Sequence, residues 1–205
     1  MMRTIFVRSC AIVSMMVGVV VMLGWIFDIP AIKSVFFFAV TMKFATALSF
    51  FLTGTMLLLL TVRQPPRKTL ILLASIQLII MGTFFIGTLL GRSIGVEKLF
   101  FSVSDSERFS GVPGYPSVMT SLLFVLVNIA FLRCKTTTSQ CLFWIGWLAI
   151  LIGSLCVIGY VFSIPQLYYY VHTLSSFSTA MAVHTGALFI VIGLGMVSSA
   201  QRRIL

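Results

Sequence analysis

The chain repeats one helical pattern, and this repetition limits the folds that it can adopt. Two glycines and a proline, spaced evenly, occur near the N-terminus and again in the last third of the sequence. The first set is Gly18, Gly24 and Pro30, and the second set is Gly153, Gly159 and Pro165. Such a repeat predicts several copies of one supersecondary unit that pack against each other.

A second pattern follows each set after a connecting segment. Methionine, threonine, phenylalanine and glycine recur at every fourth position, so they stack on one face of a helix. The members are Met42, Thr46, Phe50 and Gly54 in the first copy, Met181, Thr185, Phe189 and Gly193 in the second, and Thr120, Phe124 and Asn128 in a weaker middle copy. The sequence therefore predicts three helical hairpins whose stripes converge on a shared interior.

The stripes have two interpretations. Small residues let helices approach closely, and threonine can bond across the contact or back to its own helix. The first interpretation is therefore packing alone. The alternative is a threefold-related pocket near the outer leaflet of a membrane, floored by Thr46, Thr120 and Thr185.

Composition places these helices in a membrane. Hydrophobic residues make up 60% of the chain and charged residues 9%, whereas soluble domains carry about 25% charged residues. Most of the apolar runs approach the roughly 20 residues that span a bilayer, and backbone in lipid must bond internally. The runs are about 9–27, 42–62, 69–90, 116–132, 141–162 and 180–200. We predict an all-α polytopic membrane protein with six transmembrane helices, one integral-membrane domain over 1–205 and hairpins at about 9–62, 69–132 and 141–200.

Charge placement predicts the orientation. Four segments that would share one side of the membrane carry basic residues and no acid: the N-terminus, the turns at 63–68 and 133–140, and the C-terminus. The positive-inside rule therefore puts both termini in the cytoplasm. We expect the first helix to be retained rather than cleaved, because it matches the internal fifth run. The net charge of +10 is then mainly a topology signal, and no nucleic-acid binding is predicted.

The outward connections at 28–41, 91–116 and 163–179 each carry aromatic residues. The clusters are Phe36, Phe37 and Phe38, then Phe100 and Phe101, then Tyr168, Tyr169 and Tyr170. One interpretation is an aromatic belt at the membrane interface. The other is that these segments fold back as short interfacial helices and cover a cavity between the hairpins.

A few polar residues stand out within the apolar runs. Gln77 and Asn128 are expected to hydrogen-bond between helices or to contact a ligand, while Lys43 and His184 lie near the outer helix ends, where ionisable groups are functional candidates. The candidate ligand-binding residues are Thr46, Thr120, Thr185, His184, Lys43 and Asn128. No metal or resident cofactor is predicted, although His184 or His172 offers an alternative as a haem ligand.

The second pattern also resembles known membrane segments. Residues 42–54, MKFATALSFFLTG, resemble the MxxxTALxFLLxGxxLL helices in the N-terminal sensor regions of bacterial histidine kinases and diguanylate cyclases. Residues 181–185 are similar to the MAxHTAxxF form that closes such regions, and residues 114–120 loosely resemble their PGRMSPxTAL segment. The resemblance covers essentially the whole chain and implies a multi-pass input module of the bacterial inner membrane. Those proteins continue into cytoplasmic signalling domains, so an excised input region and a free-standing relative both stay open.

Catalysis is not predicted, because the four carboxylates form no catalytic pair and no nucleophile, phosphate loop or ligand set is recognisable. Two functions stay open. The first is a membrane sensor or assembly module that binds a small or apolar ligand or a partner membrane protein, or forms a homo-oligomer, within the lipid bilayer. The alternative is a membrane subunit that binds haem, quinone or lipid, or a small transporter component.

Overall fold

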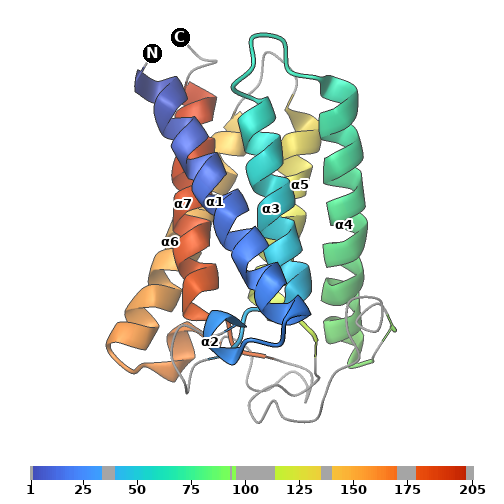
Figure 1. The fold of residues 1–205 in the computed structure, drawn as a ribbon, viewed down its shortest axis with the longest axis vertical. Coiled ribbons are helices and arrows are strands. Elements are labelled where there is room, and N and C mark those ends of the chain that lie inside the picture. Colours follow the sequence, from blue (N-terminus) through green and yellow to red (C-terminus); the bar gives the residue numbers. More distant parts are fainter. Residues whose placement is uncertain are drawn as a thin grey trace.

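The computed structural model describes residues 2–33, 40–92, 94–95, 114–134, 140–169 and 179–201. Every regular element in these ranges is a helix, which confirms the predicted all-α class. The elements are α1 (Met2–Ile26), α2 (Pro30–Lys33), α3 (Phe44–Leu59), α4 (Arg67–Leu90), α5 (Val118–Arg133), α6 (Gln140–Val161), the 3-10 helix η2 (Pro165–Leu167) and α7 (Val183–Gln201). The long helices stand side by side in one bundle (Figure 1).

Four of the described helices are long and apolar enough to cross a membrane: α1, α4, α6 and residues 183–200 of α7. Helices α3 and α5 are also apolar but have 16 residues each, or about 24 Å of helix. That length is shorter than a hydrocarbon core of about 30 Å. The four longer helices indicate a membrane-embedded protein.

The helix ends differ from the predicted runs in ways that hydrogen bonds explain. Helix α1 begins at Met2 rather than near residue 9, and the Arg8 Nε–H donates to Thr61 Oγ1 at 3.1 Å, which gives the charge a partner. Helices α3 and α7 begin later than predicted because the residues before them bond elsewhere. The Met42 N–H donates to the carbonyl of Lys33 at 3.0 Å, and the Met181 N–H donates to that of Tyr168 at 2.9 Å.

The helices are arranged in a cycle around α3, α5 and α7. Helix α1 packs on α3 and α7, α4 packs on α5 and α3, and α6 packs on α7 and α5. Each of these outer helices therefore contacts two of the central ones. The N-terminal end of α1, the turn between α3 and α4 and the C-terminal end of α7 lie at the same end of the bundle (Figure 1). We call this the terminal end, and the opposite end the outer end.

The outer helices α1, α4 and α6 finish with the same hydrogen bond. The N–H groups of Ile29, Arg92 and Ile164 donate to the carbonyls of Gly24, Gly87 and Gly159 at 2.8, 3.0 and 2.8 Å. The residues before these donors, Asp28, Gly91 and Ser163, have φ of 52, 60 and 54°. A left-handed residue with a bond back across the last turn is a common helix ending. The middle pair thus shares a glycine ending that the sequence pattern did not bring out.

Helices α1 and α3 touch backbone to backbone, and so do α6 and α7. A Cβ atom added at Gly54 would lie 2.7 Å from the carbonyl oxygen of Ala11, and one added at Gly193 would lie 2.5 Å from that of Gly146. Asn128 takes the corresponding place on α5, four residues after Phe124. The contact between α4 and α5 is therefore built from different residues.

Three phenylalanines fill the centre of the bundle. The rings of Phe50, Phe124 and Phe189 come from α3, α5 and α7 and have no exposed surface. Their centroids are separated by 4.9 Å, 5.0 Å and 4.9 Å, and their mutual angles are 50–70°. Such tilted and edge-to-face contacts are favourable aromatic geometries. The rings set the three central helices in register, so residues at equal spacing from each ring lie at equal depth.

Candidate functional site

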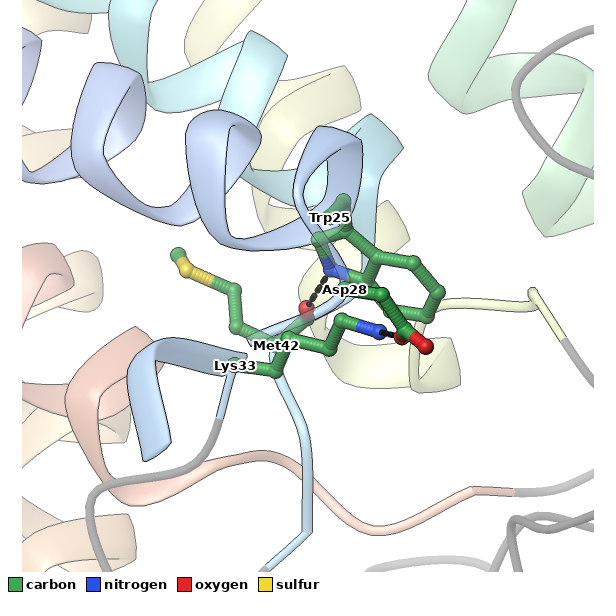
Figure 2. Close-up of polar contacts among 4 residues, drawn as sticks. All are labelled: Trp25, Asp28, Lys33 and Met42. Atoms are coloured by element: carbon green, nitrogen blue, oxygen red, sulfur yellow. Dashed lines mark hydrogen bonds and ion pairs between the residues drawn. The ribbon is translucent and has the colours of Figure 1, made fainter. Parts of the chain in front are cut away.

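The outer end of the first helix pair is closed by Trp25. Its Nε1–H donates to the carbonyl oxygen of Met42 at 2.8 Å, and the ammonium of Lys33 lies 4.5 Å from the centre of its ring. Lys33 also forms an ion pair with Asp28, as Figure 2 shows. The indole therefore ties the end of α1 to the segment that enters α3.

Tyr160 closes the third helix pair in the same way. Its hydroxyl donates to the carbonyl oxygen of Met181 at 2.9 Å, and its ring stacks on that of Tyr168 with centroids 4.1 Å apart. Trp25 and Tyr160 each follow the second glycine of the first sequence pattern directly. This shared aromatic position is a signal that sequence reasoning missed.

Tyr160→Phe is expected to lower the free energy of unfolding by about 1 kcal/mol, because one buried hydrogen bond is lost. The measurement is an SDS titration of the purified protein followed by circular dichroism. Tyr168→Phe is the matched control, since it removes a hydroxyl from the other ring of the same stacked pair. Equal losses for the two variants would contradict a specific role for the bond to Met181.

The structure places the three candidate threonines at one depth. Thr46, Thr120 and Thr185 each lie four residues before a ring of the central phenylalanine cluster, on the same helical face. Each is 2% exposed. The Thr120 hydroxyl lies 2.7 Å from the Ser117 hydroxyl. The threonines therefore form a buried polar layer directly on the outer side of the aromatic cluster.

Lys43 lies next to this layer. It is only 4% exposed although it carries a charge, and it precedes the first turn of α3 in an extended conformation. Its Nζ donates to Thr41 Oγ1 at 3.4 Å. Charged side chains at membrane depth are expensive and mark functional positions. A buried ammonium beside a layer of hydroxyls is suited to hold a polar or anionic group.

Two residues that the sequence did not single out complete the outer end. Thr179, in the segment before α7, donates its hydroxyl to the Tyr115 carbonyl at 3.2 Å and so links the third helix pair to the second. The Tyr115 ring is fully buried against Phe84, with centroids 5.1 Å apart. Its hydroxyl accepts from the Ile94 N–H at 3.0 Å. Sequence spacing gave no signal for either residue, because both lie outside the repeated pattern.

His184 and Asn128 lie apart from the threonine layer. His184 precedes Thr185 by one residue, so it points about 100° away around α7. Both of its ring nitrogens are buried without a hydrogen-bond partner. Asn128 lies two turns beyond Thr120 along α5, about 12 Å deeper. The six candidate residues therefore occupy three places: the layer with Lys43, the flank of α7, and the middle of α5.

Some expectations concern residues outside the described ranges. These are the clusters Phe36, Phe37 and Phe38 and Phe100 and Phe101, together with Tyr170 and His172. Of the two interpretations of the outer connections, short helices are present as α2 and η2. Within the described ranges, no group of three or more histidine, cysteine, aspartate or glutamate side chains is placed to hold a metal ion.

Comparisons with known proteins found no match: no protein-family model, no curated protein and no solved structure resembles the chain significantly.

Proposed function

We propose that this protein is a non-catalytic sensor or assembly module of the bacterial inner membrane. In this proposal six helices span the bilayer as three repeated hairpins in a single domain, with both termini in the cytoplasm. The module binds a small or apolar ligand, or a partner membrane protein, at the outer end of the bundle. It acts through protein–protein contacts rather than through a reaction.

The observation that carries this proposal is the buried polar layer at the outer end. Three hydroxyls, on Thr46, Thr120 and Thr185, and the ammonium of Lys43 are withdrawn from solvent. Polar groups buried at membrane depth cost free energy unless they serve structure or binding. The aromatic cluster beneath them closes the bundle toward the terminal end. A ligand that reaches the layer is thus held, and this favours sensing over passage through the bundle.

The recurring contacts support the repeat and the six spans. Helix pairs α1–α3 and α6–α7 share their glycine contacts and their aromatic closures. All three outer helices share one ending. The short helices α3 and α5 are preceded by ordered segments at 40–43 and 114–117, which supply extra length for a crossing. Basic residues at both ends of the chain support the cytoplasmic termini.

A second candidate function is a membrane subunit that carries haem, quinone or lipid. The unpartnered ring nitrogens of His184 favour it, because a neutral imidazole offers one donor and one acceptor or metal ligand. A visible absorption spectrum of the purified protein separates these functions. A Soret band that disappears in His184→Ala would establish haem binding and overturn the sensor proposal in its present form.

The sensor proposal predicts a bound molecule or a stable protein partner in gently solubilised preparations. Native mass spectrometry is expected to detect an added mass or a discrete complex. Changing Thr46, Thr120 and Thr185 together to valine should lower its occupancy roughly tenfold or more, since each hydrogen bond contributes about 1 kcal/mol. Valine keeps the shape of threonine, so folding is expected to survive.

Thr55→Val with Thr83→Val is the matched control. Both hydroxyls donate to carbonyls of their own helices, those of Phe51 and Ile79, so this variant should leave occupancy unchanged. Equal loss in the two variants would remove the threonine layer as the site. A monomer with neither added mass nor partner would contradict the proposal as a whole.

A further inference from the structure

Asn128 is buried in the middle of α5 with half of its amide unsatisfied. Its side chain has no exposed surface. Nδ2 donates to the Phe124 carbonyl at 2.7 Å, whereas Oδ1 has no hydrogen-bond partner. In a hydrocarbon environment a lone acceptor is costly. The unsatisfied oxygen indicates that a donor reaches it in another arrangement of the bundle.

Gln77 of α4 carries a donor that is now used elsewhere. Its Nε2 donates to the Ser49 carbonyl at 3.2 Å and to Thr53 Oγ1 at 2.9 Å, and both partners belong to α3. Yet α4 packs most extensively against α5. The polar side chain of α4 therefore binds the first helix pair, while its apolar surface packs on the second.

Gln77 and Asn128 lie at the same depth in the bundle. The rings of Phe50 and Phe124 contact each other, so Gly54 and Asn128, four residues further on, are level. Thr53 adjoins Gly54, and Gln77 is bonded to Thr53. Since α4 contacts both α3 and α5, its Gln77 side chain stands between the two helices that can bind it.

We propose that Gln77 is a two-position switch between these helices. In the arrangement described here its amide is bonded to α3. In the other arrangement the amides of Gln77 and Asn128 pair reciprocally, Nε2–H to Oδ1 and Nδ2–H to Oε1. The Thr53 hydroxyl then donates to the Ser49 carbonyl on its own helix, a common threonine bond. No polar group is left without a partner by the exchange.

The two arrangements have closely balanced hydrogen bonding. The first has Gln77 bonded to Ser49 and Thr53, and Asn128 bonded to Phe124. The second has the reciprocal amide pair and the bond within α3. Because the difference is small, a ligand or partner with modest differential affinity would shift the population. The switch would then move α4 between α3 and α5, whatever the identity of the ligand.

Three exposed residues at corresponding places on the outer helices make this motion measurable. Met16 of α1, Ile79 of α4 and Leu151 of α6 are 60%, 71% and 56% exposed. Spin labels at pairs of these positions, in full-length protein whose four cysteines are replaced, give distances by pulsed electron resonance in lipid. Movement of α4 from α3 toward α5 should lengthen the Met16–Ile79 distance and shorten the Ile79–Leu151 distance. The Met16–Leu151 distance is the internal control and should not change.

The unsubstituted background is expected to show two distances for each pair that includes Ile79. Asn128→Leu should abolish the α5 arrangement. Thr53→Val should enrich the α5 arrangement roughly threefold, the effect of one interhelical hydrogen bond in a membrane. Asn128→Gly, which restores the residue of the other helix pairs, should behave as Asn128→Leu does and covers a failure of the leucine variant to fold. A single distance that is unchanged across all variants would overturn the proposal, as would equal shifts in all three pairs.

Discussion

Gly193→Leu is expected to destabilise the folded protein by about 3 kcal/mol or more, because overpacking a close contact forces the backbones apart. The first atom added at this position would already lie 2.5 Å from the Gly146 carbonyl oxygen and 2.7 Å from Ile150 Cγ1. Gly54→Leu should act similarly, since a Cβ there meets the Ala11 carbonyl oxygen at 2.7 Å. SDS titration of the variants in detergent measures the loss.

Gly82→Leu is the matched control within the same kind of helix. An added Cβ at Gly82 meets no atom within 4 Å, and leucine has a better helix propensity than glycine by about 1 kcal/mol. This variant should therefore fold as well as the unsubstituted protein or slightly better. If all three variants tolerated leucine equally, the helix pairs would not be in close contact.

Phe124→Ala is expected to cost about 3 kcal/mol in the free energy of unfolding. The ring contacts both Phe50 and Phe189 at about 4.9 Å between centroids, and alanine would leave a cavity at the centre of the bundle. Lipid chains cannot replace these contacts, because the neighbouring rings are fully buried. Phe50→Ala and Phe189→Ala should have effects of similar size.

Two comparisons test whether this loss comes from the cluster. Phe162→Ala removes a ring that is 68% exposed and should cost less than about 0.5 kcal/mol. The double variant Phe50→Ala with Phe124→Ala should cost less than the sum of the single changes, because each single change already breaks their shared contact. Additive losses would show that the three rings do not act as one unit.

Much of the helix layout was predictable because the apolar runs are long and carry few charges. The boundaries were less so, and the reasons are specific. The start of α3 was misplaced because Met42 and Lys43 are apolar and helix-compatible in sequence, yet the Met42 N–H bonds to Lys33. Such a bond depends on the fold of a neighbouring segment and has no counterpart in local composition.

The candidate site was predictable in part. The threonine stripe was visible as a spacing, and the helices place its three members at one depth. His184 and Asn128 could not be sorted from that layer in advance. A difference of one residue turns a side chain by about 100°, and a difference of eight moves it about 12 Å. Thr179 and Tyr115 were missed because their contact joins segments that are distant in sequence.

By itself the sequence determined that the chain is helical and suited to a membrane, because hydropathy and the four-residue spacing are local properties of each run. It also determined which residues recur. Only the tertiary structure decided what the recurring residues touch. It brought Phe50, Phe124 and Phe189 together, turned Gly54 and Gly193 toward their outer helices, and left Asn128 half satisfied beside a glutamine bonded elsewhere. The physical reason is that a helical pattern states the face of a side chain, whereas its partner depends on how helices from distant parts of the chain pack.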